Sequence, residues 1–248
     1  MRHARLALAA SASVLGLAFP ASAGNLTVGA GSTLDLGTGS LALGCADLDV
    51  AGTLTAGSVG FDAARDVAIA PGGTVNGNSA TLSLSGDWDN AGTFNAGTST
   101  VQMVDGCAVL SGVVVGNSSF ANFAISTTSA RLVSFTAGST QTVTGLLSLQ
   151  GSAGNLLQIR STLGGSAAFL NVLGSSSASF VDVDDNDALA GNDIALPANS
   201  VKGPNTPGWV LATAVPMLSP MALGALALLL LASGRRWLPR STQADRSL

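Results

Sequence analysis

The chain has 248 residues, of which 47% are hydrophobic and 10% are charged, and its formal net charge at pH 7 is −4. It contains no Glu and no Tyr, and its one histidine is His3. General acid–base catalysis draws mostly on His, Glu, Asp and Lys, so an enzyme would have few groups to use. Between residues 24 and 214, thirteen Asp oppose four basic residues, a formal charge of −9. Phosphate backbones need clustered Lys and Arg, so we expect no nucleic-acid partner.

Residues 1–23 have the three parts of a cleavable signal peptide. Arg2 and Arg5 give a positive start, residues 6–19 form an apolar segment, and Ala21-Ser-Ala23 is a small-residue cleavage site. This order of parts is typical of exported proteins and differs from a membrane-spanning helix, which is longer. We therefore predict that the export machinery and signal peptidase process the chain, and that the mature protein begins near residue 24.

A short repeat runs through the first part of the predicted ectodomain, residues 24–208. Each copy places a Thr and an apolar residue after a glycine-containing turn, at Thr33, Thr53, Thr74 and Thr93, so the copies are almost equally spaced. The period is roughly 20 residues, and a fixed period of this length is the signature of a repeat architecture built from stacked units.

Short segments with apolar residues at every second position accompany three of these turns, at residues 48–50, 67–69 and 82–84. Such alternation places the apolar side chains on one face of a strand. A unit of strand, turn and strand cannot bury its apolar face alone, so successive units must stack. The sequence therefore predicts an all-β ectodomain folded as a right-handed parallel β-helix. An antiparallel β-sandwich, with similar strand spacing, is the alternative.

Cys45 and Cys107 are the two cysteines of the chain. An even number in an exported protein makes one disulfide the default expectation. Three repeat periods almost span the segment between them, which would place them three coils, or roughly 14 Å, apart at about 4.8 Å per coil. That exceeds the usual Cα separation in a disulfide. Either an irregular hairpin near residues 59–66 folds back to allow the bridge, or both cysteines are buried free thiols.

The stretch Gly86–Gly97 contains a Gly-x-Trp-x-Asn-x-Gly-x-Phe unit. It resembles the repeat of filamentous, haemagglutinin-like bacterial surface proteins with β-helical ectodomains, and residues 203–209 resemble the final turn of that family. The resemblance implies a structural stalk or adhesin more than an enzyme. Its implied partners are glycans or proteins of the envelope or the surrounding matrix.

An acidic cluster near the end of the ectodomain matches four oxygen-donor positions of an EF-hand calcium loop. These are positions 1, 3, 5 and 12, occupied by Asp182, Asp184, Asn186 and Asp193. Asp187 stands where that loop needs Gly for its sharp turn. The sequence thus leaves two interpretations, a calcium-dependent carbohydrate-binding module or a solvated acidic turn.

A polysaccharide lyase or hydrolase is a further alternative, because parallel β-helices include such enzymes. Their sites need basic residues near a uronate, or a carboxyl group of raised pKa opposite a second carboxylate. The basic residues between 24 and 214 are scattered in sequence, namely Arg65, Arg131, Arg160 and Lys202. We therefore expect no enzyme and name no catalytic residue.

The C-terminal region, residues 215–240, combines a short motif, an apolar segment and a basic stop. Residues 218–234 are long enough to cross a bilayer, and Arg235 and Arg236 would keep residues 241–248 in the cytoplasm. The motif consists of Val215, Pro216, Leu218, Ser219 and Pro220.

This order of parts resembles the IPTL-CTERM class of bacterial sorting tails, although Met217 and Met221 replace two usual residues. The resemblance implies processing by an exosortase-type membrane transpeptidase. Residues 209–214 would be a linker before the tail. The protein would span the inner membrane once before processing and then reach the cell envelope or surface, whereas a plain tail anchor would leave it uncleaved.

Overall fold

The computed structural model describes residues 17–18 and 24–212. Most of the predicted signal peptide and the whole predicted sorting tail lie outside these residues, so both stay predictions. Across the described ranges, the structure contains no helix that is long and apolar enough to cross a membrane. The described residues belong to one compact unit that ends at Ala212.

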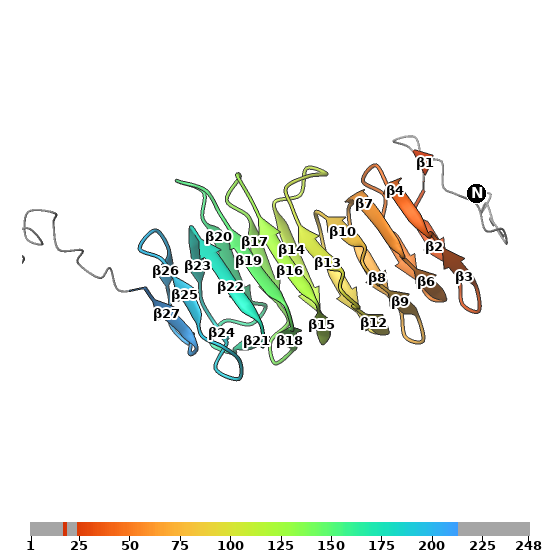
Figure 1. Ribbon diagram of the computed structural model, residues 1–248. Helices are drawn as coiled ribbons and strands as arrows, with labels where there is room; N and C mark the ends of the chain where they lie inside the picture. The colour runs from red at the N-terminus through yellow and green to blue at the C-terminus, as the bar shows by residue number, and fades with distance from the viewer. Residues whose placement is uncertain (1–16, 19–23, 213–248) are drawn as a thin grey trace, which may run out of the picture. The chain divides into compact units, whose positions relative to one another are not determined.

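Every described strand lies in a parallel sheet, and the strands run side by side from one end of the unit to the other (Figure 1). The eight-stranded sheet has the order β1 (Leu17–Ala18), β4 (Thr38–Ala42), β7 (Ser58–Ala64), β10 (Thr81–Leu84), β13 (Thr100–Met103), β16 (Asn122–Ser126), β19 (Leu146–Gln150) and β22 (Ser175–Ser179). The nine-stranded sheet has the order β2 (Leu26–Val28), β5 (Leu48–Val50), β8 (Val67–Ile69), β11 (Trp88–Asn90), β14 (Ser111–Val115), β17 (Leu132–Phe135), β20 (Leu157–Ser161), β23 (Val181–Val183) and β26 (Val201–Lys202).

Shorter sheets complete the third side. One contains β3 (Thr33–Asp35), β6 (Thr53–Thr55), β9 (Thr74–Asn76) and β12 (Thr93–Asn95), and the next contains β15 (Ser118–Phe120), β18 (Thr140–Val143), β21 (Ala168–Val172) and β24 (Asn186–Asp187). The last pair, β25 (Ile194–Leu196) and β27 (Trp209–Leu211), lies on a different side, because β25 contacts β22 and continues the side of the eight-stranded sheet. The chain visits the three sides in turn, so the fold is a parallel β-helix. The prediction of that fold is confirmed, and the β-sandwich alternative is wrong.

The repeat read from the sequence is the stacking register of the coils. Thr33 pairs with Thr53, Thr53 with Thr74, and Thr74 with Thr93. The residue after each Thr points inward, and its apolar side chain joins the shared core. One period of the repeat therefore corresponds to one full coil.

Each coil has three strands, one more than the predicted unit of strand, turn and strand. Residues 48–50 and 67–69 form β5 and β8 of the nine-stranded sheet, as their similar spacing suggests. Residues 82–84 instead belong to β10 of the eight-stranded sheet. The strand that precedes Thr93 on the nine-stranded side is β11. Alternation identified these strands but not the side of the coil on which each one lies.

The Trp motif is explained by packing. Trp88 is fully buried, and its indole N–H donates a hydrogen bond to Ser118 Oγ at 3.0 Å. Asn90 Nδ2 donates to the same oxygen at 3.1 Å. The Trp88 ring lies 4.9 Å from the ring of Phe94 and 5.5 Å from that of Phe120, measured between centroids. The motif therefore supplies an aromatic core in which the indole N–H has a hydrogen-bond partner.

The C-terminal coil extends further than the sequence predicted. Trp209 is fully buried, and its indole N–H donates to Asn186 Oδ1 at 3.1 Å. The strand that begins at this residue, β27, pairs in parallel with β25. Residues 209–211 are thus part of the solenoid. The predicted linker at 209–214 begins too early, because the last coil closes only with Trp209.

Candidate functional site

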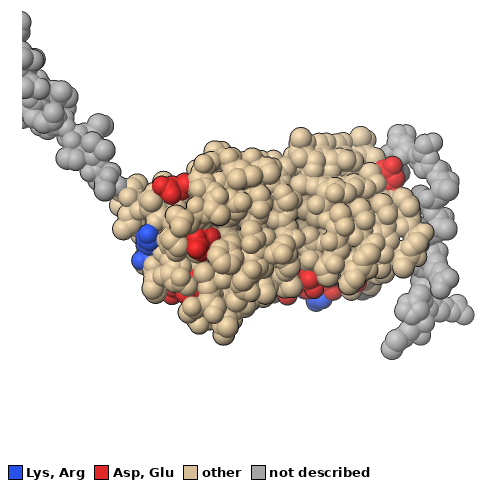
Figure 2. Space-filling model, turned by 90° about the horizontal axis from the view of Figure 1, so that it is seen from below, with Lys and Arg blue, Asp and Glu red and all other residues tan. Residues whose placement is uncertain are grey.

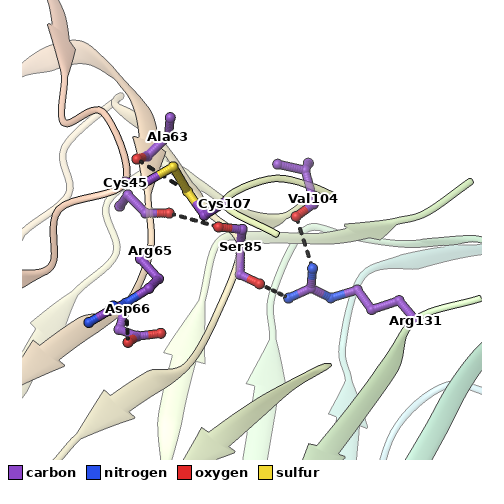
Figure 3. Close-up of a disulfide and its surroundings, with 9 residues drawn as sticks. Cys45, Ala63, Arg65, Asp66, Ser85, Val104, Cys107 and Arg131 are labelled. Carbon is purple, nitrogen blue, oxygen red and sulfur yellow. Dashed lines mark hydrogen bonds and ion pairs between the residues drawn. A yellow bond between two sulfur atoms is a disulfide. The ribbon is translucent and has the colours of Figure 1, made fainter. Parts of the chain in front are cut away.

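The most irregular part of the solenoid is a disulfide-bonded corner (Figure 3). Cys45 and Cys107 are joined by an S–S bond of 2.08 Å, and their Cα atoms are 5.5 Å apart. Cys45 follows β4 and Cys107 follows β13, three strands away in the same sheet. The structure therefore contains the bridge that regular stacking would place out of reach.

A hairpin closes the distance. Gly106 and Val109 form an antiparallel bridge inside residues 104–110, which we call the corner hairpin. Its Cys107 Sγ lies 4.0 Å from the carbonyl oxygen of Ala63, the residue at which β7 changes register against β10. The backbone N–H of Cys45 donates to the same carbonyl at 2.7 Å. The hairpin predicted at residues 59–66 is wrong, since most of that segment is strand β7 and the hairpin lies on the Cys107 side.

A buried arginine holds the base of the corner hairpin (Figure 3). Arg131 has no exposed surface; its Nη1 donates to the carbonyl of Val104 at 2.9 Å, and its Nη2 donates to the carbonyl of Ser85. Burial lowers the pKa of the guanidinium, and the negative charges of Asp105 and Asp87 oppose that shift. The side chain thus ties the ends of β10 and β13 to the coil that contains β17.

Asp105 fixes the other side of the same hairpin. Its Oδ2 accepts hydrogen bonds from the backbone N–H and the hydroxyl of Thr128, at 2.7 and 3.1 Å. Burial alone would raise the pKa of this carboxyl group. Hydrogen bonds from the Thr128 backbone and from the hydroxyls of Thr127, Thr128 and Ser129 outweigh that effect, and the pKa is lowered. The ionised carboxylate is therefore the stabilised form.

The lowered pKa makes the anchoring role of Asp105 pH-dependent. The folded pKa lies below the ordinary value of 3.8, so its contribution is complete above about pH 4 and disappears as pH falls through the folded pKa. We expect Asp105→Asn to lose about 1 kcal/mol of unfolding free energy at pH 7, and the loss should shrink below pH 3.8. Urea denaturation at several pH values measures this. Asp89→Asn, on β11, is the control, and a pH-independent loss for Asp105→Asn would contradict the assignment.

A hollow of about 260 Å³ lies between the corner hairpin and the eight-stranded sheet. We call it the corner hollow. Its polar lining includes Asp62 on β7, Ser83 on β10, Gln102 on β13 and Asp105 on the hairpin. Gln102 Nε2 donates to Ser83 Oγ at 2.6 Å, so the amide and the hydroxyl are held in place against one another. Asp62 is exposed.

The four residues predicted to bind calcium do not form one loop. Asp182 lies in β23, where its Oδ2 contacts Arg160 Nη2 at 2.6 Å. Asn186 is fully buried and accepts the Trp209 hydrogen bond. Asp184 is half-buried between β23 and β24, and Asp193 is exposed just before β25. Within the described residues, no group of three or more His, Cys, Asp or Glu could hold a metal ion. Calcium binding here remains a sequence-based prediction, and the contacts of Asp182 and Asn186 give it no support.

The surface offers few charges to a ligand. Figure 2 shows one face, on which Lys, Arg and Asp are sparse and separated by wide uncharged areas. Two of the four basic residues between 24 and 212 are already engaged with aspartates, because Arg65 contacts Asp47 at 2.6 Å and Arg160 contacts Asp182. Arg131 is buried. Recognition at this surface would depend on hydroxyl, amide and carboxylate groups.

Comparison with known proteins finds no matching family model, no matching curated protein and no matching solved structure. The two resemblances drawn from the sequence therefore stay predictions.

Proposed function

We propose that this protein is an exported, adhesin-like module that presents a rigid β-helix at the bacterial cell surface. The observation that carries the proposal is the parallel β-helix itself, which is consistent with a structural surface-repeat protein. Nine strands stacked at about 4.8 Å give an axis of roughly 40 Å. A rod of that length is too short to span a thick envelope layer. It is better suited to displaying a contact face close to the membrane.

The outer face of the eight-stranded sheet suits such contacts. Its outward positions carry hydroxyl and amide groups, at Thr81, Ser83, Thr100, Gln102, Asn122, Ser148 and Ser177. Neutral polar groups held in strands can exchange hydrogen bonds with glycans or proteins without the desolvation cost of buried charges. The proposed partners are therefore envelope or matrix glycans or proteins.

The proposed route to the surface depends on the two ends of the chain. Residues 1–23 would direct export and be removed by signal peptidase. Residues 215–240 would hold the protein in the inner membrane, with Arg235 and Arg236 on the cytoplasmic side, until an exosortase-type transpeptidase processes it. Both segments are sequence-based proposals that agree with an ectodomain poor in catalytic groups.

The corner hollow favours binding over hydrolysis. Asp62 and Asp105 both line it, and a glycosidase would need one of two such carboxyl groups to carry a proton at working pH. The pKa of Asp105 is lowered instead of raised, so this group is a poor proton donor. We therefore propose a non-enzymatic role and assign no catalytic residue.

Intact mass spectrometry of the protein from the cell envelope tests the proposed delivery. We expect a species that begins near residue 24 and lacks the residues after the sorting motif. Alanine replacement of Val215, Pro216, Leu218, Ser219 and Pro220 should leave the tail uncleaved, because the recognition sequence is gone while the apolar segment remains. A wild-type species that ends at Leu248 would overturn the sorting proposal and indicate a single-pass anchor.

A further inference from the structure

We infer that the corner hollow is a binding subsite for one uncharged sugar residue, and that the Cys45–Cys107 disulfide builds its wall. The inference rests on the proposed surface role, since it names the ligand class that this module would contact. It needs no calcium, so it differs from the metal-dependent binding considered from the sequence. Its basis is the size of the hollow, its largely apolar exposed lining and the few polar and charged groups beside that lining.

The size of the hollow limits the ligand. Pockets for drug-sized molecules begin at about 300 Å³, and the corner hollow measures about 260 Å³. It can therefore accept a single sugar ring but not a longer oligosaccharide. The rest of a glycan chain would extend along the outer face of the eight-stranded sheet, where the polar groups of neighbouring strands continue.

The polar groups match the hydroxyls of a sugar. The Asp62 carboxylate can accept two hydrogen bonds, and the Gln102 side-chain oxygen can accept another. Ser83 is buried, and its Oγ accepts from Gln102 Nε2 at 2.6 Å, so it fixes the orientation of the Gln102 amide. The exposed Ala63 adds a small apolar surface against which the C–H face of a ring can rest. A few fixed polar groups beside apolar surface are the usual composition of a small-molecule site.

The charges around the hollow select against anionic sugars. Asp62 and Asp105 both line it, and a uronate or phosphate bound in it would be repelled by their negative charges. The nearby cation, Arg131, is fully buried and donates to the carbonyls of Ser85 and Val104. Its N–H groups are therefore not available to an acidic ligand, and its charge offsets part of the charge of Asp105, so Asp62 supplies most of the repulsion. An uncharged ring meets no such penalty.

The disulfide sets the geometry of the wall. Gly106 and Cys107 line the hollow from the hairpin, and Asp62 lines it from β7. The bond to Cys45 holds this wall over the sheet. Without the bond, the hairpin would keep its base at Arg131 and Asp105 but lose the attachment of its tip. Sugar affinity should therefore depend on the oxidised state.

Saturation-transfer NMR with the purified full-length chain tests the subsite. Methyl glucoside, N-acetylglucosamine and glucuronate are the three probes, each measured with and without EDTA. We expect saturation of at least one uncharged sugar, no saturation of glucuronate, and no effect of EDTA. Gln102→Ala and Asp62→Ala should each weaken the affinity about tenfold, the effect of losing one good hydrogen bond to the ligand.

Gln150→Ala is the matched control, because Gln150 lies on β19 of the same sheet but outside the corner hollow. It should leave the affinity unchanged, whereas the double Cys45→Ser, Cys107→Ser variant should abolish saturation while the variant remains folded by circular dichroism. The inference is overturned if neither uncharged sugar is saturated, if glucuronate binds equally well, or if Gln102→Ala and Gln150→Ala behave alike. Those results would leave the proposed surface role intact, since export and tail processing are measured by intact mass.

Discussion

Replacing Cys45 and Cys107 with Ser is expected to lower the unfolding free energy by about 4 kcal/mol. The two cysteines are far apart in sequence, with a separation of 62, so the bond removes much of the conformational freedom of the unfolded chain. It also ties the first coil to the fourth. In a solenoid, stability comes from contacts between neighbouring coils. A disulfide that connects coils several interfaces apart keeps any one of those interfaces from separating on its own.

Urea denaturation followed by tryptophan fluorescence measures this effect, because Trp88 and Trp209 are fully buried in the folded unit. Wild-type protein with a reductant should resemble the double serine variant, and the variant itself should not respond to the reductant. Hydrogen exchange adds a local measurement: the backbone amide at position 45, which donates to the Ala63 carbonyl at 2.7 Å in the wild type, should be less protected from exchange in the variant. An unchanged urea midpoint for the variant would show that the bond contributes little.

The stacking of the first four coils could be predicted from the sequence because their turns recur at nearly constant spacing. Thr33, Thr53, Thr74 and Thr93 are direct partners in the structure. Inward and outward positions alternate in each short strand, so the pattern of apolar residues also predicted which side chains face the core. What the period could not give was the third strand of each coil, since a strand pattern carries no information about which sheet it joins.

The period fails where the corner hairpin is inserted. Trp88 pairs with Val67 of the preceding coil and with Val114 of the following coil, and the second step along the chain is clearly the longer one. The additional residues make the hairpin that carries Cys107. The sequence does contain a signal for it, because Asp105-Gly106 is a common turn dipeptide. The prediction assumed equal spacing between all coils. It therefore did not anticipate that an inserted hairpin reaches back across coils and forms the disulfide.

The predicted calcium residues show a different limit of sequence reasoning. Their spacing matches an EF-hand loop, but the backbone that carries them does not form such a loop. Asp182 and Asn186 lie in different strands, β23 and β24, and face different surroundings. Asp182 contacts Arg160, whereas Asn186 is buried against Trp209. Spacing alone cannot separate a metal loop from two strands joined by a turn. Trp209, which donates the hydrogen bond to Asn186, is also distant from it in sequence, so the spacing of the acidic cluster gave no sign of this contact.

Arg131→Met is expected to cost roughly 3–6 kcal/mol of unfolding free energy, based on two charge-assisted hydrogen bonds at about 1.5–3 kcal/mol each. Methionine fills similar volume, so the loss would come mainly from the carbonyls of Ser85 and Val104, which Arg131 now satisfies. Removing the cation would also leave Asp105 and Asp87 without its attraction. This is a case in which a buried charge is compensated by the backbone of two neighbouring coils.

Arg160→Met is the matched control for the same urea measurement. Arg160 also contacts an aspartate and backbone carbonyls, but its side chain is 27% exposed, so its loss should cost no more than about 1 kcal/mol. Arg131→Lys should recover only part of the stability, since one ammonium group cannot reproduce the planar two-sided contact of a guanidinium. Equal losses for Arg131→Met and Arg160→Met would show that the buried arginine is not the anchor of the corner. A larger loss confined to Arg131 would identify the buried arginine as the anchor of the hairpin base.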